Sequence, residues 1–568
     1  MQRRRRTSIS LALIIIGVIL IIISLMGLPD QIASAKYPGA LDRKAESLAA
    51  LALESGVSAP TEDGFTVWFS VSNGRSRARV AGGSGDTLEK AWDTALSAAE
   101  KLVSSALIEP VWVKADVLTE AKPVTAAELK ELSGEYKSGY LRRGVAFGSL
   151  DNALMEAEVN FAGVFDYEAG AFNEAALYAY LAETGRQPSG LDGMELLTCR
   201  SWFCGEDGMS YALDDNGMRE MDASLSETAE AMLGTVSAKL GSMVQSDGSF
   251  IYGWQLSDGH EFTGYNVVRH CGAAWSMIKM YERGNESLAG AIKKAVGYVA
   301  KNCVTYRDDG AAFIVEEKSD ELKLGAGALA AAMFTEYEKA FGGGQYTELA
   351  ERLGDGMLAM RLPEGGFYHV WNTDFSEKER DRTVYYDGEA TFALTLLYGM
   401  DGDEKWLSAA KDAADWLISS GYEQYGDHWV SYAINELTKY APEEKYFEFA
   451  LKNVSGNLED ARTRVTAGFT DFEMLGAARA LISRMQSGNL FPELLQGFDT
   501  AALDDAADLR AGYMETAYGW PEYAMYFGDP QAALGGVYAR EDGARMRIDD
   551  LQHFACGYML YLDGDMEY

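Results

Sequence analysis

Two kinds of helical pattern alternate along the chain after about residue 220. One kind is amphipathic with a charged face, and the other is small, apolar and aromatic around most of its surface. A helix that is apolar all round must be buried on most sides, whereas a charged face lies against solvent. The alternation therefore predicts an inner ring of helices inside an outer ring. The amphipathic segments are residues 285–301, 346–360, 403–420 and 442–453, and the apolar ones are 267–279, 324–334, 389–400 and 472–481.

Polar side chains gather at the starts of the apolar helices. If inner and outer helices run in alternating directions, every inner helix starts at the same end of the ring. These groups then converge on one rim, which predicts an active site there. They are Tyr265, Asn266, Arg269 and His270; Asp387 and Glu389; Asp427 and His428; Asp471 and Glu473; and Asp549, Asp550 and His553.

The first part of the chain has a different pattern. Residues 64–72 alternate apolar and polar positions and are rich in β-branched and aromatic types, which predicts a strand. Asn73-Gly74 is a hairpin signal, so residues 75–81 are expected to form the returning strand. A helix over 41–55, another over 87–107 and a strand over 111–118 complete the prediction. We expect a small α+β domain over 36–220 and a helical domain over 221–568.

Short aromatic turns separate the helices of the second domain, as in Asp247-Gly248-Ser249-Phe250 and Glu364-Gly365-Gly366-Phe367. Twelve candidate helices form six hairpins, each burying its face only against its neighbours. The pattern, with the motifs Tyr-Asn-Val-Val-Arg-His (265–270), Tyr-Tyr-Asp-Gly-Glu (385–389) and Arg-Ile-Asp-Asp-Leu-Gln-His (547–553), resembles the six-hairpin glycosidase-like superfamily. The resemblance covers about 60% of the chain. It implies a mainly α fold, an (α/α)6 toroid, and an enzyme that hydrolyses, eliminates or epimerises sugar polymers.

The N-terminus predicts a membrane anchor. Arg3–Arg6 precede an apolar or small stretch over residues 11–28. Its 18 residues span about 27 Å as a helix, close to the thickness of a bilayer core of roughly 30 Å. The arginines favour a cytoplasmic N-terminus with the rest of the chain outside. Ala33-Ser34-Ala35 fits a signal-peptidase site, so cleaved secretion after Ala35 is the alternative to an uncleaved anchor.

Charge and cysteines narrow the function further. The 568 residues carry a net charge of −36, which argues against nucleic-acid binding and against docking on an anionic membrane surface. Of the five cysteines, Cys199 and Cys204 form either a short-loop disulfide or two buried thiols, and the second reading is favoured. The five histidines are scattered in sequence, so we expect no metal site and no cofactor.

Carboxyl groups are the first candidates for catalysis. Glycoside hydrolysis needs one protonated and one ionised carboxyl on either side of the bond. Asp387 or Glu389 is expected to face Asp471, Glu473 or Asp550 across the ring. The alternative for each is a helix cap, because acids at a helix start satisfy free N–H groups and oppose the helix dipole.

The segment of residues 265–270 is the second candidate. On a helix, Tyr265 and Arg269 share one face, as do Asn266 and His270. By resemblance to toroid lyases, Arg269 would neutralise a uronate carboxylate, and Tyr265 or His270 would move a proton. The alternative is that Arg269 pairs with an acid of a neighbouring helix and that His270 is a core residue with satisfied nitrogens.

Aromatic residues near loops and helix starts supply candidate sugar platforms. We expect Trp254, Trp371 and Tyr386 to contact substrate, with His553 as a further binding residue, although most tryptophans are core residues.

Three hypotheses follow. The favoured one is a membrane-tethered, extracytoplasmic glycoside hydrolase acting on a polysaccharide or glycan, with His270 helping at the carboxyl site. The second is a polysaccharide lyase or uronyl C5-epimerase. The third is a glycan-binding or scaffolding subunit of an exopolysaccharide system without catalytic activity.

Overall fold

The computed structural model describes residues 37–58, 64–135, 141–166, 171–184, 186, 193–215, 217–221, 223–316 and 319–564. The predicted anchor and the Ala33-Ser34-Ala35 site lie outside these ranges. Within them, no helix has the length and apolar character needed to cross a bilayer. The chain forms two compact units. The first contains Met1–Glu220 with Leu256–Gly259 and Trp520–Leu534, and the second contains the remaining residues.

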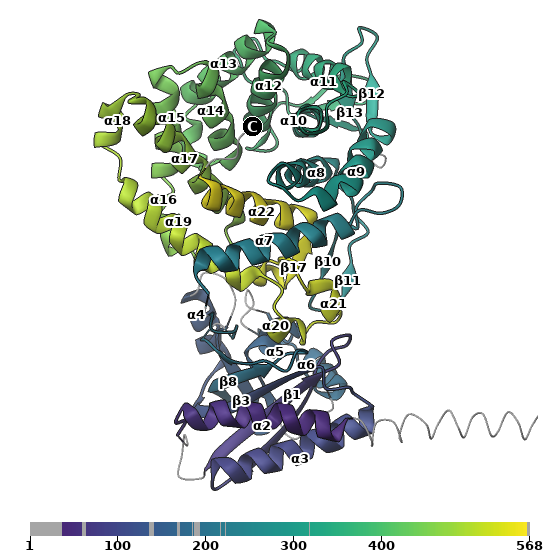
Figure 1. Cartoon of the computed structure of the whole chain (residues 1–568), viewed down its shortest axis with the longest axis vertical. Coiled ribbons are helices and arrows are strands. Elements are labelled where there is room, and N and C mark those ends of the chain that lie inside the picture. Colours follow the sequence, from purple (N-terminus) through teal and green to yellow (C-terminus); the bar gives the residue numbers. More distant parts are fainter. Residues whose placement is uncertain are drawn as a thin grey trace, which may run out of the picture. The chain divides into compact units, whose positions relative to one another are not determined.

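The N-terminal unit is built on an antiparallel sheet of seven strands (Figure 1). The strand order is β2-β1-β3-β8-β4-β5, and β9 pairs with β8. The strands are β1 (Phe65–Ser72), β2 (Arg79–Gly85), β3 (Trp112–Pro123), β4 (Gly144–Phe147), β5 (Ser149–Leu154), β8 (Met194–Cys204) and β9 (Ser210–Leu213).

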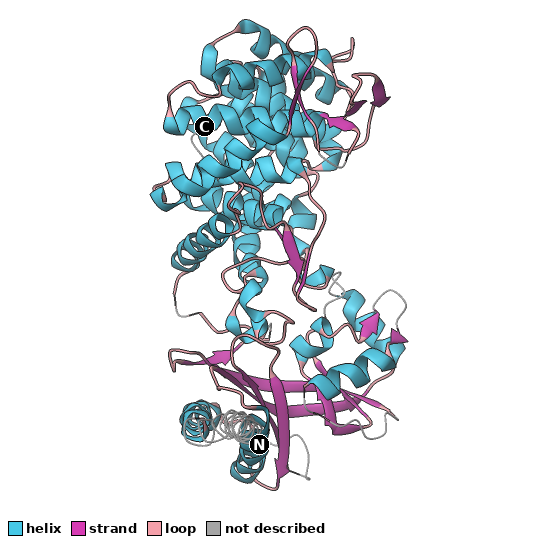
Figure 2. Cartoon of the chain, turned by 90° about the vertical axis from the view of Figure 1, so that its right-hand side faces the viewer, coloured by secondary structure: helices cyan, strands magenta, loops and turns pink. Residues whose placement is uncertain are grey.

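Both faces of this sheet are covered, because successive side chains of a strand point to opposite faces. In β1, Phe69 packs against helices α2 (Pro38–Glu54) and α3 (Leu88–Ala106), whereas Trp68 belongs to a second cluster on the other face. Figure 2 shows the helix pair beside the strands. Thr87 caps α3 by accepting a hydrogen bond from the Lys90 N–H. The two predicted helices and the strands over 64–72 and 111–118 are therefore present with small shifts at their ends.

The predicted tight turn at Asn73-Gly74 is wrong. The returning strand begins at Arg79, not at residue 75. The Asn73 side chain accepts hydrogen bonds from the N–H groups of Arg75 and Ser76, which stabilises a longer loop. Local side-chain bonding of this kind competes with the two-residue hairpin.

Cys199 and Cys204 lie on the same strand, β8, and both are free thiols. A strand rises about 3.3 Å per residue, so their Cα atoms are about 16 Å apart, too far for a disulfide. The reading as two thiols is therefore confirmed, although only Cys204 is fully buried and Cys199 is partly exposed.

The remaining elements of the N-terminal unit are small. They are α4 (Ala126–Glu135), α5 (Glu156–Phe161), α6 (Glu174–Glu183), β6 (Phe165–Asp166), β7 (Ala171–Phe172), α20 (Pro521–Ala524) and α21 (Pro530–Ala533). A buried ion pair joins Arg219 to Glu522 at 2.8 Å, and the Ala78 N–H donates to the Met525 carbonyl at 2.7 Å. These bonds attach residues 520–534 to a unit that is made mostly from the first part of the chain.

The second unit contains six inner and six outer helices (Figure 1). The inner helices are α8 (Val267–Glu282), α10 (Leu324–Phe341), α12 (Tyr386–Asp401), α14 (His428–Tyr440), α17 (Phe469–Gly488) and α22 (Ile548–Asp563). The outer helices are α7 (Leu225–Ser242), α9 (Ala289–Asn302), α11 (Thr347–Ala359), α13 (Glu404–Ser419), α15 (Glu444–Ser455) and α19 (Thr500–Met514).

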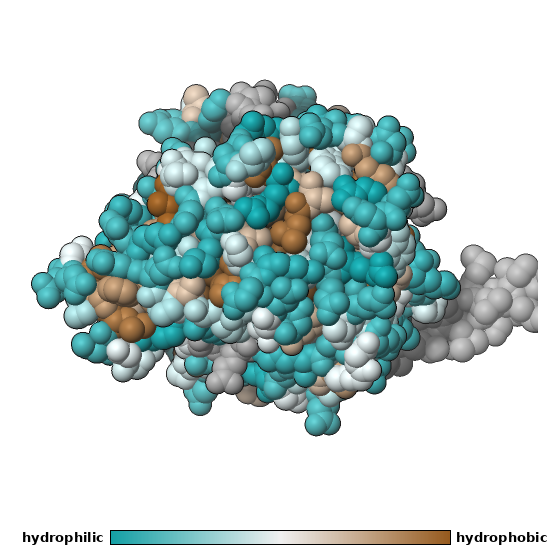
Figure 3. All heavy atoms as spheres, turned by 90° about the horizontal axis from the view of Figure 1, so that it is seen from above, coloured by the Kyte–Doolittle hydropathy of each residue, from teal (hydrophilic) through white to brown (hydrophobic). Residues whose placement is uncertain are grey.

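The inner helices form a closed ring. Each packs against the next in chain order, and α22 packs against α8 to complete the circle. Outer helices pack behind them, as α11 does on α10 and α13 on α12. The predicted (α/α)6 toroid is therefore present, and the amphipathic and apolar segments occupy the outer and inner positions expected. The face of the molecule in Figure 3 is mostly hydrophilic, with scattered apolar patches.

Short strands and helices fill the connections between the main helices. They are β10 (Gly253–Gln255), β11 (His260–Glu261), β12 (Val304–Tyr306), β13 (Ala312–Ile314), β14 (Glu321–Lys323), β15 (Val370–Asn372), β16 (Glu377–Glu379), β17 (Arg545–Arg547), α16 (Leu458–Thr463) and α18 (Pro492–Gln496).

Two helical glycines test how tightly the rings pack. A Cβ added at Gly354 of α11 would lie 2.5 Å from the Trp406 ring, whereas one at Gly234 of α7 would meet no atom within 4 Å. We expect Gly354→Ala to destabilise the helical unit by about 1–3 kcal/mol through overpacking. Gly234→Ala should stabilise it by about 0.5–1 kcal/mol through helix propensity. Circular dichroism measures the thermal unfolding temperature of both variants. If the two substitutions shift this temperature in the same direction, the packing described here is wrong.

Candidate active site

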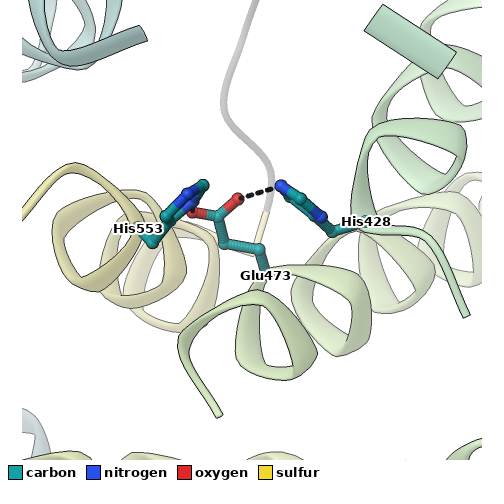
Figure 4. Close-up of side chains that lie close together, drawn as sticks. All are labelled: His428, Glu473 and His553. Atoms are coloured by element: carbon teal, nitrogen blue, oxygen red, sulfur yellow. Dashed lines mark hydrogen bonds and ion pairs between the residues drawn. The ribbon is translucent and has the colours of Figure 1, made fainter. Parts of the chain in front are cut away.

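Three side chains from three inner helices meet at the N-terminal end of the ring (Figure 4). His428 is the first residue of α14, Glu473 lies in the second turn of α17, and His553 lies in the second turn of α22. The Nδ1 atom of His553 is 3.0 Å from Oε1 of Glu473, and Nε2 of His428 is 3.9 Å from Oε2 of the same carboxyl. The expected convergence of inner-helix starts is therefore observed.

His428 is buried in an unusual way. Its side chain is 2% exposed, and neither ring nitrogen has a hydrogen-bond partner within the part of the chain that the structure describes. Burial, with a smaller effect from His553, holds the pKa of His428 well below its ordinary value of 6.5. A neutral imidazole with a free lone pair is a base or a metal ligand.

Glu473 and His553 form a pair with one accessible end. Burial raises the pKa of Glu473, whose side chain is fully buried, while His553 opposes that shift. Burial alone would lower the pKa of His553, but the carboxyls of Glu473, Asp549 and Asp550 together outweigh it and raise this pKa above 6.5. The His553 side chain is 16% exposed. Glu473 holds Nδ1, which leaves Nε2 for a ligand.

Tyr385 lies beside His428 and is 38% exposed. Its ring meets the imidazole edge-on, with the ring centroids 5.3 Å apart. Burial is the main cause that raises the pKa of Tyr385, and the carboxyls of Asp427, Asp471 and Glu389 raise it further. The Tyr385 hydroxyl is therefore close to carboxyls of three inner-helix starts.

Glu389 and Asp427 are two buried carboxyls next to Tyr385. Glu389 is 4% exposed and Asp427 is 1% exposed, and one oxygen of each lacks a hydrogen-bond partner among the described residues. Burial raises the pKa of both well above the ordinary range, and Asp427 raises that of Glu389 further. The other Asp427 oxygen accepts from the Trp429 N–H at 2.8 Å, so Asp427 also caps α14.

Arg269 and Asp549 connect α8 to this group. The guanidinium of Arg269 pairs with Asp549 at 2.9 Å and is 34% exposed. Asp549 also pairs with Arg547 at 2.8 Å. The predicted catalytic acid Asp550 instead accepts from the Arg547 N–H at 2.9 Å, the capping alternative, and burial raises its pKa to about 6.

His270 does not point into the ring. Its Nε2–H donates to the Ala295 carbonyl on the outer helix α9 at 2.9 Å, and its Nδ1 accepts from the Tyr265 hydroxyl at 2.7 Å. Burial lowers its pKa to about 4. His270 therefore matches the core alternative, whereas Tyr265 is partly exposed and donates its hydroxyl proton to His270. Adjacent helical residues point about 100° apart, so Arg269 faces α22 while His270 faces α9.

Asp387 is also placed differently from the prediction. Its carboxylate accepts from the His369 Nε2–H at 2.7 Å and from the Phe367 N–H at 3.2 Å, and it is 1% exposed. These bonds hold the loop before α12, which is a structural role. Tyr386 is buried against His369, with the ring centroids 5.4 Å apart, so it is not an open sugar platform.

The two tryptophans predicted to contact substrate and the predicted catalytic residue Asp471 differ in their exposure and contacts. Trp371 is 6% exposed and stacks on Phe313, which makes it a core residue. Trp254 is half-buried on β10, below the Lys239 ammonium. Asp471 is 20% exposed and pairs with Arg464 at 2.6 Å, near Tyr385.

Sequence reasoning placed His428 and Asp427 at a helix start but gave them no role, and it gave Tyr385 none either. The only sequence feature that could have identified these residues is their position at the start of an inner helix, and Glu473 lies close to such a position. Sequence distance hid the contact, because 45 residues separate His428 from Glu473 and 80 separate Glu473 from His553.

The same three groups are candidates for a metal site. One ligand atom each from His428, Glu473 and His553 lie within 4.8 Å of one another. The sequence analysis placed these residues on one rim but could not predict which of them touch, and the scatter of the histidines along the chain argued against a metal.

No family model and no curated protein matches the chain. Similar solved structures include a cellobiose 2-epimerase from Bacillus thermoamylovorans, with 13% identity and a TM-score of 0.47 over 59% of this chain and 98% of that chain. A D-mannose isomerase has 12% identity and a TM-score of 0.44 over 60% and 99% of the two chains. An α-1,6-mannanase from Salegentibacter sp. has 15% identity and a TM-score of 0.40 over 61% and 100%. At these identities and TM-scores the likeness is one of overall fold and assigns no activity to this chain.

We expect the pKa values of the two histidines to lie on opposite sides of 6.5. His553 should stay protonated above that pH and His428 neutral below it. Replacing Glu473 by Gln removes the carboxylate that raises the pKa of His553, so this pKa should fall. The ring resonances in a ¹⁵N NMR titration measure both groups. A His553 pKa unchanged in Glu473→Gln would contradict the pairing.

Proposed function

We propose that this protein is a carbohydrate-active enzyme that moves a proton on a sugar substrate, as an isomerase or epimerase. The observation that carries the proposal is the placement of two imidazoles on one carboxyl, Glu473, beside the exposed ring of Tyr385. A proton-transfer reaction at carbon needs a base and an acid within reach of one small ligand. The opposite pKa directions of His428 and His553 support this division of roles.

The step balances without a redox partner. His428 takes the proton from a carbon next to a carbonyl, and the electron pair of that C–H bond forms the C=C bond of an enediol. The carbonyl oxygen takes a proton from Nε2 of His553. A proton from solvent on the other face of the same carbon gives an epimer, and the new hydroxyl returns its proton to Nε2 of His553. Return of the proton from His428 to the neighbouring carbon gives an isomer, and the hydroxyl on the first carbon then gives its proton to Nε2 of His553.

The neighbouring side chains suit a sugar. The exposed face of Tyr385 offers an apolar surface for the C–H face of a pyranose. Asp471 and the guanidinium of Arg269 are partly exposed and can bind hydroxyls. Glu389 and Asp427 have a free oxygen each, which a ligand hydroxyl can satisfy.

Hydrolysis is the second candidate function, and one observation favours it. Glu389 is a buried carboxyl whose raised pKa keeps it protonated, as the general acid of a glycosidase must be. Asp471, nearby and paired with Arg464, is the second carboxyl that could act with it. In this reading the two histidines bind substrate.

We further propose, from the sequence of residues 1–35, that the enzyme is tethered to a membrane and faces a glycan outside the cytoplasm. Association with exopolysaccharide machinery belongs to the same proposal. Cell fractionation of the full chain, followed with and without protease on the outside, tests it: a chain found wholly in the cytosol would refute the tether.

A deuterium-exchange assay tests the proton transfer. The purified chain is incubated in D₂O with a panel of reducing sugars and uronate-containing glycans, and deuterium at carbon is read by NMR. His428→Gln and His553→Gln should each lower the exchange rate by about 10²–10⁴-fold, the usual contribution of a general acid or base. His260→Gln, at an exposed histidine, is the control and should keep the rate.

The same panel separates the alternatives. New reducing ends that disappear in Glu389→Gln but persist in His428→Gln would favour hydrolysis and refute the proton-transfer proposal. Absorbance of unsaturated uronates would indicate elimination. Binding of a glycan without any chemical change would favour the scaffold hypothesis.

A further inference from the structure

The trio of His428, Glu473 and His553 has the composition of a transition-metal site. Two imidazoles and one carboxylate are a common ligand set of catalytic zinc, whose fourth position stays open for water or substrate. The three side chains come from three different inner helices and approach from three directions (Figure 4). We propose that this trio binds one divalent transition-metal ion, with Zn²⁺ as the ion that fits it.

The separations suit a tetrahedral ion. Bonds of about 2.0–2.1 Å put neighbouring ligand atoms of a tetrahedral zinc about 3.3 Å apart. Oε1 of Glu473 is 3.0 Å from Nδ1 of His553 and Oε2 is 3.9 Å from Nε2 of His428. One ligand atom from each of the three side chains lies within 4.8 Å of the other two. Small side-chain rotations on fixed helices therefore close the trio on an ion.

Unpartnered atoms point to a ligand. Both ring nitrogens of the buried His428 and the Oε2 atom of the fully buried Glu473 lack a hydrogen-bond partner among the described residues. Buried polar atoms in native proteins are nearly always satisfied. A metal ion would satisfy an imidazole lone pair and the free carboxylate oxygen together.

Two further groups are placed to orient the ligands. Oδ1 of Asp427 is 3.5 Å from Nδ1 of His428, on the ring edge away from Glu473. A carboxylate behind the second nitrogen is the usual support of a metal-bound histidine. The Tyr432 hydroxyl lies near the Glu473 carboxyl and opposes the rise of its pKa that burial causes.

The bound ion would change the reaction. It would occupy the lone pair of His428 and break the hydrogen bond between Glu473 and His553. We therefore expect Zn²⁺ to inhibit proton transfer reversibly. This consequence rests on the proposed function, whereas the binding itself does not.

Isothermal titration of the purified, chelator-treated chain with ZnCl₂ tests the binding, and Co²⁺ supplies a second readout through the visible absorption of a four-coordinate ion. We expect one Zn²⁺ per chain, released by EDTA. His428→Gln, Glu473→Gln and His553→Gln should each weaken binding by at least about tenfold. His260→Gln should bind as the unaltered chain does.

Circular dichroism of each variant separates lost binding from lost folding. Folded variants that bind Zn²⁺ as tightly as the unaltered chain would overturn the proposal, as would the lack of stoichiometric Zn²⁺ and of the Co²⁺ absorption. Zn²⁺ that binds one per chain without slowing deuterium exchange would uphold the metal site and count against the proposed proton transfer.

Discussion

Closure of the inner helical ring is the constraint on which this site depends. Each inner helix packs against two inner neighbours and one or more outer helices. Polar groups along its middle would be buried at a cost in free energy, so they are expected at its ends. Antiparallel hairpins place every inner N-terminus at the same end. Polar residues at helix starts, which are hundreds of residues apart in places, therefore become neighbours through packing alone.

That packing also sets the electrostatics. His428, Glu389, Asp427 and Glu473 are withdrawn from water by the helices around them, and burial is the first cause of each pKa shift. A buried polar atom without a partner costs about 1–3 kcal/mol. Several such atoms at one end of the ring lower the stability of the fold, so their presence needs a reason other than stability. A bound ligand that completes their hydrogen bonds or metal bonds does explain it.

The sequence predicted the ring but only part of the site. Apolar and charged periodicity depends on burial around each helix, so the inner and outer helices could be assigned from residues alone. The rotation of a helix about its axis decides which residue at its start faces inward. Side chains that are one position apart point in directions that differ by about 100°. The structure fits the alternative in which Arg269 pairs with an acid of a neighbouring helix and His270 is a core residue, and not the reading in which His270 faces substrate. The turn at Asn73 failed for a local reason, a side-chain hydrogen bond.

Two histidine–carboxylate pairs in the ring separate structural from chemical roles. In His369 and Asp387, both ring nitrogens and both carboxylate oxygens are bonded within the protein, and the pair is 1–2% exposed. In His553 and Glu473, one carboxylate oxygen has no hydrogen-bond partner in the described part of the chain, and the imidazole is 16% exposed. The first pair has no capacity left for a ligand. The second keeps an unbonded oxygen and a partly exposed imidazole beside His428, whose ring nitrogens have no partner among the described residues. Catalysis or metal binding requires such unbonded atoms.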